Sequence, residues 1–407
     1  MKGKTIRRKV ANFQSSRLRQ ARIAKGWSMV DLARQIGLTR QAISSFEKGE
    51  ANPSYETLRD IARSLDVKEA FFSLPDDGHR TLQRQSAVNF RTLKSSLSRE
   101  RDQAHIFLMW FVEFCDSLHV KYVDFQQVKL PKFDIDDFEK LTADDIEYFA
   151  EQTRRFFGLG DGPISDLTLL LENHGVLIGY VPLPQKMDGL SAWFNGRPFV
   201  LINSNAYACR ARLDLAHELG HLILHSSLAQ EDLDQKYILD LVEKQAFQFG
   251  ASFLVPERSI AQEFYGFDLG ALEALKKRWK VSMQALAMRL FSIGLIGERQ
   301  KTYFFQKMAA AGIRKKEPLD AEIAAEKSIT IKRIIESLDA SGILSASDFL
   351  EEASFPEFLI KSLSGLPDEF FIPKAYMGNV VQLRHSATQL QQDTGNNVTI
   401  CNGFTKG

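Results

Sequence analysis

Apolar side chains recur every three or four positions through residues 16–67, which is the spacing of one buried helix face. Residues typical of helix starts interrupt this pattern at Ser28, Thr39 and Ser54, and Asp31 follows Ser28 at the spacing of a capping box. Glycines follow the first three runs, as they often do where helices end. The sequence therefore predicts four short helices, at residues 16–25, 28–36 and 40–48 and from Ser54 onward.

Both helical and strand patterns occur downstream of residue 100. Residues 102–118 predict a helix whose apolar side packs in a core, through Ile106, Phe107, Trp110, Phe111 and Phe114. Short runs of β-branched and aromatic residues predict strands at residues 176–181, 190–194 and 198–202. Further helices are predicted at residues 238–254, 269–278, 282–291, 327–338 and 346–363. The predicted fold class is α+β, with an all-α N-terminal domain, a central α+β domain and a mainly helical C-terminal region.

The length of 407 residues favours two or three domains. With 44% hydrophobic and 25% charged residues, the chain has the balance of a globular protein, which excludes a disordered chain, a collagen and a coiled-coil rod. The predicted divisions are an N-terminal domain at residues 1–75, a linker with a helix at 76–142, a central domain at 143–297 and a C-terminal region of unassigned role at 298–407.

The composition also bears on location. No apolar run reaches the roughly 18–20 residues of a membrane span. The basic residues 1–10 are not followed by the apolar core of a secretory signal. Cys115, Cys209 and Cys401 are few and widely separated, unlike a disulfide framework. We therefore expect a cytoplasmic protein with no membrane partner.

The net charge of +1 conceals an uneven distribution. Residues 1–70 contain 15 Lys and Arg against 7 Asp and Glu, a net of +8, so the other 337 residues carry 37 against 44, a net of −7. A basic head on a mildly acidic body indicates a module that binds a polyanion, because Lys and Arg release counterions from phosphate backbones.

The second and third predicted helices have the spacing of a helix-turn-helix, with Gly37 at the turn and Ile43 beneath it. Residues 15–73 resemble the lambda-repressor-like, or XRE-type, regulators, above all in the run Thr-Arg-Gln-Ala-Ile-Ser-Ser-Phe-Glu-Lys-Gly at 39–49. The resemblance implies that the third helix enters the major groove of double-stranded DNA and that the protein acts as a homodimer. The predicted DNA-contacting residues are Arg40, Gln41, Ser44, Ser45, Ser28 and Lys48. The basic arm at residues 2–9 can add backbone contacts; the alternative is a helical bundle that binds only protein.

Residues 216–221, Ala-His-Glu-Leu-Gly-His, carry the strongest chemical signal in the chain. His217 and His221 lie four positions apart, so on a helix their imidazoles are about 40° apart around the axis and roughly 6 Å apart along it, within reach of one metal ion. Glu218 follows the first histidine directly, where its carboxylate can take a proton from water beside the metal. Zn²⁺ suits two neutral imidazoles and an open position.

A catalytic zinc ion usually has a third protein ligand. His225 comes four positions after the second histidine, but on a continuing helix it would rise about 12 Å from the first, too far to share the ion. Ser227 occupies the position where a longer motif has its third histidine. Glu243 is the better candidate, because a carboxylate among the apolar residues of the helix at 238–254 is costly unless paired or metal-bound. Asp240, one turn earlier, is the alternative.

Residues 144–294 resemble the ImmA/IrrE-type metallopeptidases. The resemblance rests on Gly-Pro-Ile at 162–164, which is expected to open a helix, on Asp-Gly-Leu-Ser-Ala-Trp at 188–193, on Arg-Pro at 197–198, on Arg210 and Arg212, on the histidine motif with His225, and on Glu-Lys-Gln-Ala at 243–246 with Leu-Val-Pro at 254–256. It implies a compact zincin-like α+β domain in which Glu243 is the third zinc ligand and Glu218 the catalytic base. Leu213 and Phe247 depart from the family's usual Phe and Asn, outside the ligand set.

Zincins commonly bind a substrate peptide along an edge strand, and a Tyr, His or Arg often stabilises the developing oxyanion. The sequence does not identify the strand. Tyr207, Arg210 and Arg212 are close to the motif in sequence, and a structural role is favoured for each.

These observations predict a DNA-binding regulator that carries a zinc-dependent endopeptidase. The peptidase resemblance implies that the substrate class is helix-turn-helix repressors, so a repressor-like partner or the chain itself is the expected target. One alternative is a zincin-like domain that senses a ligand or binds a protein without hydrolysis. Another is an antitoxin-like regulator that binds a toxin through its C-terminal region.

Overall fold

The computed structural model describes residues 12–76, 98–135, 137–226, 228 and 235–373, and the backbone of residues 89–90. The basic arm at 2–9, Ser227 and Cys401 lie outside the described residues. Within the part of the chain that is described, no helix is long and apolar enough to cross a membrane.

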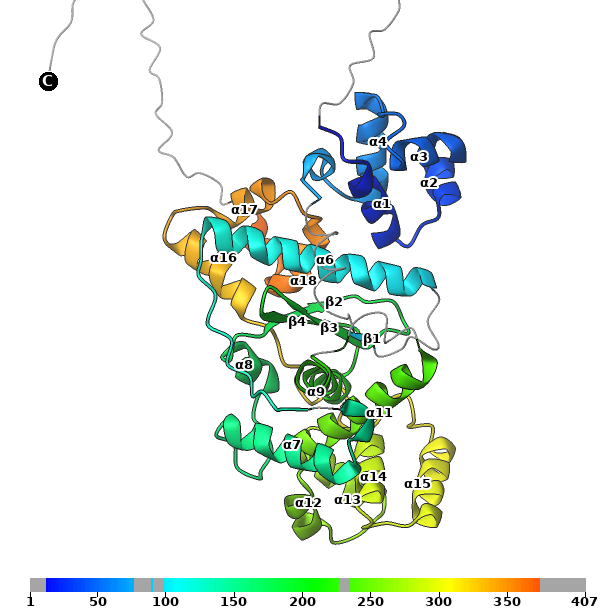
Figure 1. Ribbon diagram of the computed structural model, residues 1–407, viewed down its shortest axis with the longest axis vertical. Coiled ribbons are helices and arrows are strands. Elements are labelled where there is room, and N and C mark those ends of the chain that lie inside the picture. The colour runs from blue at the N-terminus through cyan, green and yellow to red at the C-terminus, as the bar shows by residue number, and fades with distance from the viewer. Residues whose placement is uncertain are drawn as a thin grey trace, which may run out of the picture. The chain divides into compact units, whose positions relative to one another are not determined.

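The four N-terminal helices predicted from the sequence are confirmed (Figure 1). They are α1 (Ser15–Ala24), α2 (Met29–Gln35), α3 (Arg40–Glu47) and α4 (Tyr55–Leu65), and the 3₁₀ segment η1 (Glu69–Ser73) follows them. Ser28 and Asp31 form the predicted capping box, and Thr39 and Ser54 each accept a hydrogen bond from the backbone N–H three residues later. Ile43, on the inner side of α3, is fully buried. The order and packing of these helices are those of a helix-turn-helix domain.

Helix α6 (Ser98–Lys121) confirms the helix predicted at residues 102–118 and extends it at both ends. The whole of its predicted apolar side is buried. Its polar residues contact α1: Arg17 pairs with Glu113 at 2.8 Å, and Trp110 Nε1 donates to Gln20 Oε1 at 3.0 Å. The helix-turn-helix is therefore joined to the rest of the chain through buried polar contacts as well as apolar ones.

A four-stranded sheet has the order β1-β3-β4-β2. Its strands are β1 (Asn89–Phe90), β2 (Leu177–Val181), β3 (Gly189–Phe194) and β4 (Arg197–Asn203), of which the last three were predicted. β4 pairs in parallel with β2 and antiparallel with β3, and β1 pairs antiparallel with β3. Asn195 and Gly196 join β3 to β4 with φ angles of 47° and 75°, the positive values that a tight type I′ hairpin turn needs.

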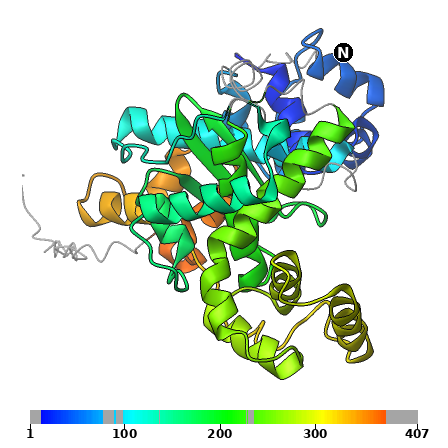
Figure 2. The same cartoon turned by 60° about the horizontal axis from the view of Figure 1, so that its bottom comes forward.

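Helices cover both faces of the sheet (Figures 1 and 2). α6 and α18 (Glu357–Ser364) contact one face, and α9 (Ala208–Leu224) contacts the other. Successive residues of β4 point to opposite faces: Leu201 belongs to the core shared with α6, whereas Val200 and Ile202 belong to the core around α9. The sheet thus separates the helix-turn-helix side of the chain from the side that carries the histidine motif.

The remaining helices complete an α+β fold, as predicted. They are α7 (Ala143–Phe156), α8 (Leu167–Glu172), α11 (Lys236–Leu254), α12 (Glu257–Glu263), α13 (Leu269–Trp279), α14 (Met283–Ser292), α15 (Glu298–Ala310), α16 (Thr330–Ala340) and α17 (Ala346–Glu352), with 3₁₀ turns η2 (Phe138–Lys140) and η3 (Asp368–Phe371). Two expectations were wrong. The single helix predicted at 346–363 is two helices, because the chain leaves α17 and restarts at Pro356, the cap of α18. Residues 162–164 open no helix; α8 begins later, with Asp166 as its cap.

Candidate metal centre

Helices α9 and α11 carry the histidine motif and the predicted third ligand, and they cross at short range. A Cβ added at Gly220 of α9 would lie 3.0 Å from the carbonyl oxygen of Ala246, and one added at Gly250 of α11 would lie 2.9 Å from the backbone nitrogen of His217. Glycine at these two positions therefore allows the two backbones to approach. The close approach brings the α11 carboxylate within reach of the α9 histidines.

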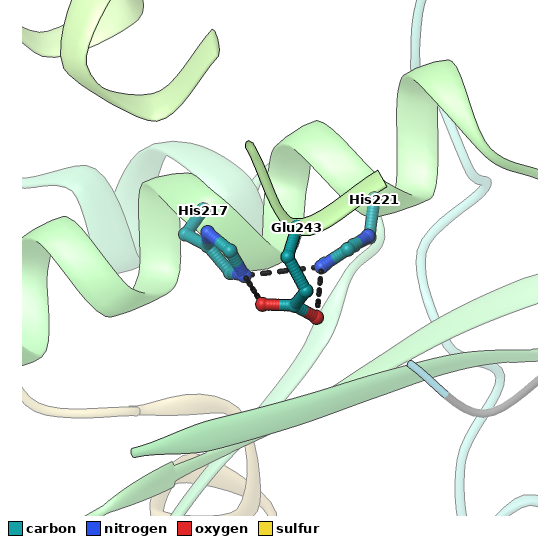
Figure 3. Close-up of side chains that lie close together, drawn as sticks. All are labelled: His217, His221 and Glu243. Atoms are coloured by element: carbon teal, nitrogen blue, oxygen red, sulfur yellow. Dashed lines mark hydrogen bonds and ion pairs between the residues drawn. The ribbon is translucent and has the colours of Figure 1, made fainter. Parts of the chain in front are cut away.

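His217, His221 and Glu243 converge at this crossing (Figure 3). The two Nε2 atoms are 3.0 Å apart. Glu243 Oε2 lies 3.4 Å from His217 Nε2, and Glu243 Oε1 lies 3.4 Å from His221 Nε2. One ligand atom from each of the three residues falls within 4.8 Å of the others. Two imidazoles and one carboxylate are a donor set of catalytic zinc sites, so these residues fit Zn²⁺.

The groups around Glu243 keep its carboxylate ionised, which is the form that binds a metal. Both histidines are buried, whereas the Glu243 side chain retains 22% of its exposure and forms the open side of the group. Burial alone would raise the pKa of Glu243, but its contacts with His217 and His221 outweigh burial and hold that pKa well below its usual range. Glu243 is therefore ionised, as a ligand must be.

Glu218 points from α9 toward β3, and its side chain is fully buried. Ser191 Oγ on β3 donates a hydrogen bond of 2.6 Å to Glu218 Oε2. Gly189 of the same strand leaves room for the carboxylate, because a Cβ there would lie 3.1 Å from Glu218 Oε1. The sequence placed Ser191 in a family-like stretch but gave it no role, since nothing in the spacing shows that β3 lies beside the motif.

His225 contacts the centre in a way that the sequence did not foresee. Helix α9 ends at Leu224 and His225 is its C-cap, with its backbone N–H still bonded to the carbonyl oxygen of His221. Its Nδ1 lies 3.1 Å from His221 Nδ1, and its Nε2 lies 2.8 Å from Gln245 Oε1. Burial lowers the pKa of His225 to about 3, so its ring is neutral. His225 lies outside the group of three converging ligand atoms.

Known proteins resemble two parts of this chain. Residues 18–72 match the helix-turn-helix family, and residues 171–291 match the IrrE N-terminal-like domain. The chain joins a helix-turn-helix domain to an IrrE N-terminal-like domain. The HTH-type transcriptional regulator SutR of Escherichia coli (strain K12) is 35% identical over 66 residues, which are 16% of this chain and 37% of SutR. The match spans little more than a third of that relative. The two family matches confirm both resemblances drawn from the sequence.

Other candidates in the IrrE N-terminal-like domain lie apart from the ligand cluster. Arg212 is buried, donates to the carbonyl oxygen of Ile164 and pairs with Glu326, which is a structural role. Arg210 is exposed and pairs with Asp188 at 3.3 Å. Tyr207 precedes α9 and is 42% exposed, and Asp240, the alternative third ligand, is exposed on α11 outside the cluster.

The helix-turn-helix domain presents the predicted DNA-contacting residues to different degrees. Arg40, Gln41 and Lys48 are exposed on or beside α3, and Ser44 and Ser45 are half-buried there. Ser28 is exposed, but its hydroxyl is engaged with Asp31 in the cap of α2, at 2.7 Å.

Proposed function

We propose that the chain is a DNA-binding transcriptional regulator whose central domain is a zinc-dependent endopeptidase that cleaves a regulatory protein. The observation that carries the proposal is the convergence of His217, His221 and Glu243, together with the buried carboxylate of Glu218, the residue that follows His217 on the same helix. We assign the first three as ligands of Zn²⁺ and the last as general base. The peptidase domain is proposed as residues 143–297 and the DNA-binding domain as residues 1–75.

The chain's own residues would perform the proton transfers. When bound, Zn²⁺ supplies a Lewis acid that polarises water and the peptide carbonyl. Glu218 accepts the proton of the attacking water and returns it to the leaving amine when the C–N bond breaks. The hydrogen bond from Ser191 fixes one oxygen of Glu218 and so orients the carboxylate. Both side chains are fully buried, so bulk water is kept from the carboxylate.

We propose that the substrate peptide lies along β3 in an extended conformation. Support comes from β1, a short segment of the chain itself, which pairs antiparallel with β3 and places Asn89 opposite Ser191. Ser191 also touches Glu218, so the edge that accepts a strand adjoins the base. Because β1 comes from the linker predicted at residues 76–142, the chain itself is a candidate substrate beside a repressor-like partner.

We propose that α3 reads the major groove with Arg40 and Gln41, which can make bidentate contacts to guanine and adenine. Ser44, Ser45 and Lys48 would add contacts around them, and Ser28 would meet a phosphate through the start of α2. Because the proposed partner is double-stranded DNA, we also propose a cytoplasmic location and binding as a homodimer on paired half-sites.

A cleavage assay tests the enzymatic proposal. The zinc-loaded chain is incubated with candidate helix-turn-helix repressors and alone, and fragments are identified by mass spectrometry. Glu218→Gln is expected to keep its fold and metal but to cleave at least about 100-fold more slowly, as loss of a general base does. Glu257→Gln, at an exposed position on α12, is the matched control and keeps wild-type activity. Intact proteins in every reaction, or equal cleavage by Glu218→Gln, would refute hydrolysis by this centre.

A cavity favours ligand sensing as a second candidate. It measures about 310 Å³, lies between α6 and the sheet face opposite α9, and is lined in part by Val112, Cys115, Phe125, Phe194, Arg197 and Phe199. Because α6 also contacts α1, a ligand in this cavity would contact the helix that packs against the DNA-binding domain. Under this alternative, DNA affinity changes with a small aromatic ligand and is unaffected by Glu218→Gln.

A further inference from the structure

A chain of buried polar contacts runs from a backbone carbonyl to the metal centre. Gln245 Nε2 donates to the carbonyl oxygen of Phe138 at 2.7 Å. Gln245 Oε1 lies 2.8 Å from His225 Nε2, and His225 Nδ1 lies 3.1 Å from His221 Nδ1. His221 then presents its Nε2 to His217 and Glu243. The first three contacts have hydrogen-bond length, so each of those three pairs shares one proton.

The carbonyl of Phe138 sets the direction of every bond in this chain. A carbonyl oxygen only accepts, so the amide of Gln245 must place its NH₂ group there and turn its oxygen toward His225. That oxygen also only accepts, so His225 Nε2 carries a proton and donates it. A second proton would place a positive charge on a ring that is only 2% exposed, so Nδ1 keeps its lone pair, which faces His221.

We infer that His225 is a positioning residue that holds His221 in the tautomer with its proton on Nδ1, so that the Nε2 lone pair points at the metal site. His221 Nδ1–H donates to His225 Nδ1, and the metal-facing nitrogen is thereby left unprotonated, as a ligand must be. The inference rests on the metal centre proposed above. It gives His225 and Gln245 a role in orienting His221, although neither residue is itself a ligand.

The three side chains of this hydrogen-bond chain are buried, so each partner is hard to replace. His221 has no exposed surface, and His225 and Gln245 are each about 2% exposed. Water cannot readily replace a lost partner, so removal of the His225 acceptor would leave a buried N–H donor unsatisfied or release the His221 ring. Neither outcome keeps the Nε2 lone pair aimed between His217 and Glu243. The ring centres of Phe138 and His225 are 6.2 Å apart and the two rings are nearly perpendicular, so Phe138 limits rotation of His225.

Zinc affinity tests the role of the His225 acceptor. The affinity of the full chain for Zn²⁺ is measured by chelator competition for wild type, His225→Phe and His225→Gln. His225→Phe keeps a ring but loses the acceptor, and about 10–100-fold weaker binding is expected. His225→Gln supplies a new acceptor and donor, and most of the affinity should return. His119→Phe, at a histidine on α6 remote from the motif in sequence, is the control and binds as wild type. Equal zinc affinity for wild type and His225→Phe would overturn the inference.

The tautomer itself can be observed without metal. Long-range ¹H–¹⁵N spectra of metal-free, ¹⁵N-histidine-labelled wild type should show His221, assigned by loss of its signals in His221→Gln, with its proton on Nδ1. A proton on Nε2 would overturn the inference, even where His225→Phe fails to fold. If wild type binds no zinc, the proposed function fails, but the observed tautomer of His221 still shows whether His225 accepts its Nδ1 proton. If wild type binds zinc and the tautomer is wrong, only the role of His225 fails.

Discussion

Gly250→Ala probes the close crossing of α9 and α11 on which the metal centre depends. The added Cβ would stand 2.9 Å from the nitrogen of His217, and 3.0 and 3.2 Å from the carbonyl carbon and oxygen of Ala216. Ordinary contacts of this kind begin near 3.4 Å. All three neighbours are backbone atoms, so no side-chain rotation can relieve the clash and the two helices must move apart by several tenths of an ångström.

Two opposing effects set the size of the change. Alanine in place of glycine within a helix stabilises it by about 1 kcal/mol. Overpacking against backbone costs about 1–3 kcal/mol, so the expected result is a net loss of up to about 2 kcal/mol in the free energy of unfolding. Separation of α9 from α11 also carries Glu243 away from the histidines, and zinc affinity should fall with stability.

Urea unfolding of the metal-free protein and chelator competition for zinc measure the two effects. Gly270→Ala is the matched control, because Gly270 is exposed on α13 and a Cβ there meets only its cap side chain at 3.4 Å. The control should be as stable as wild type or slightly more so, with unchanged zinc affinity. If Gly250→Ala behaves like Gly270→Ala in both measurements, the close crossing does not position the ligands.

Three further predictions follow from buried polar groups. Ser191→Ala removes a donor to the fully buried Glu218 carboxylate and should lower the free energy of unfolding by about 1–3 kcal/mol in urea; unchanged stability would show that the bond is dispensable. The pKa of His225 in the folded protein, about 3, lies below its ordinary value of about 6.5. Between these two values the unfolded chain binds more protons than the folded one, so the metal-free protein loses stability as the pH falls below about 6.5. The slope is at most about 1.4 kcal/mol per pH unit from this group, and urea titrations at several pH values should find it shallower in His225→Gln; an identical slope would contradict the assignment. Arg212→Met removes the positive partner of Glu326, which keeps only its hydrogen bonds from Leu167 and Thr168 at a nearly buried site, and should cost about 3–5 kcal/mol. Arg155→Met, at an exposed pair, should cost under about 1 kcal/mol, and similar losses for both variants in thermal unfolding would argue against a buried ion pair.

The parts of the fold that local sequence determines were predictable. Ser28, Thr39 and Ser54 mark helix starts by their own hydrogen bonds, and each helix begins beside them. The spacing of His217 and His221 on one buried helix likewise predicted two converging imidazoles. Glu243 was chosen on a second helix because of its apolar neighbours, and its carboxylate lies within 4.8 Å of the ligand atoms of the two histidines; its role as a ligand stays a prediction.

The parts that depend on contacts between distant segments were not predictable. Ser191 meets Glu218 only because β3 packs on α9, and the sequence carries no spacing rule for that contact. His225 lies beside His221 on the same turn, but nothing in the spacing shows that Gln245 of α11 contacts its other ring nitrogen. The pairing of β1 with β3 likewise joins segments about 100 residues apart. Such contacts arise from tertiary packing, which a local pattern does not contain.

The zinc content per chain shows whether His217, His221 and Glu243 hold one zinc ion. Wild type, Glu243→Gln and the exposed control Glu257→Gln are exchanged into zinc, freed of loosely bound metal and measured by mass spectrometry. About one zinc per chain is expected in wild type and the control, and a large loss in Glu243→Gln. Folded wild type without zinc, or Glu243→Gln that retains zinc with undiminished affinity, would contradict this assignment.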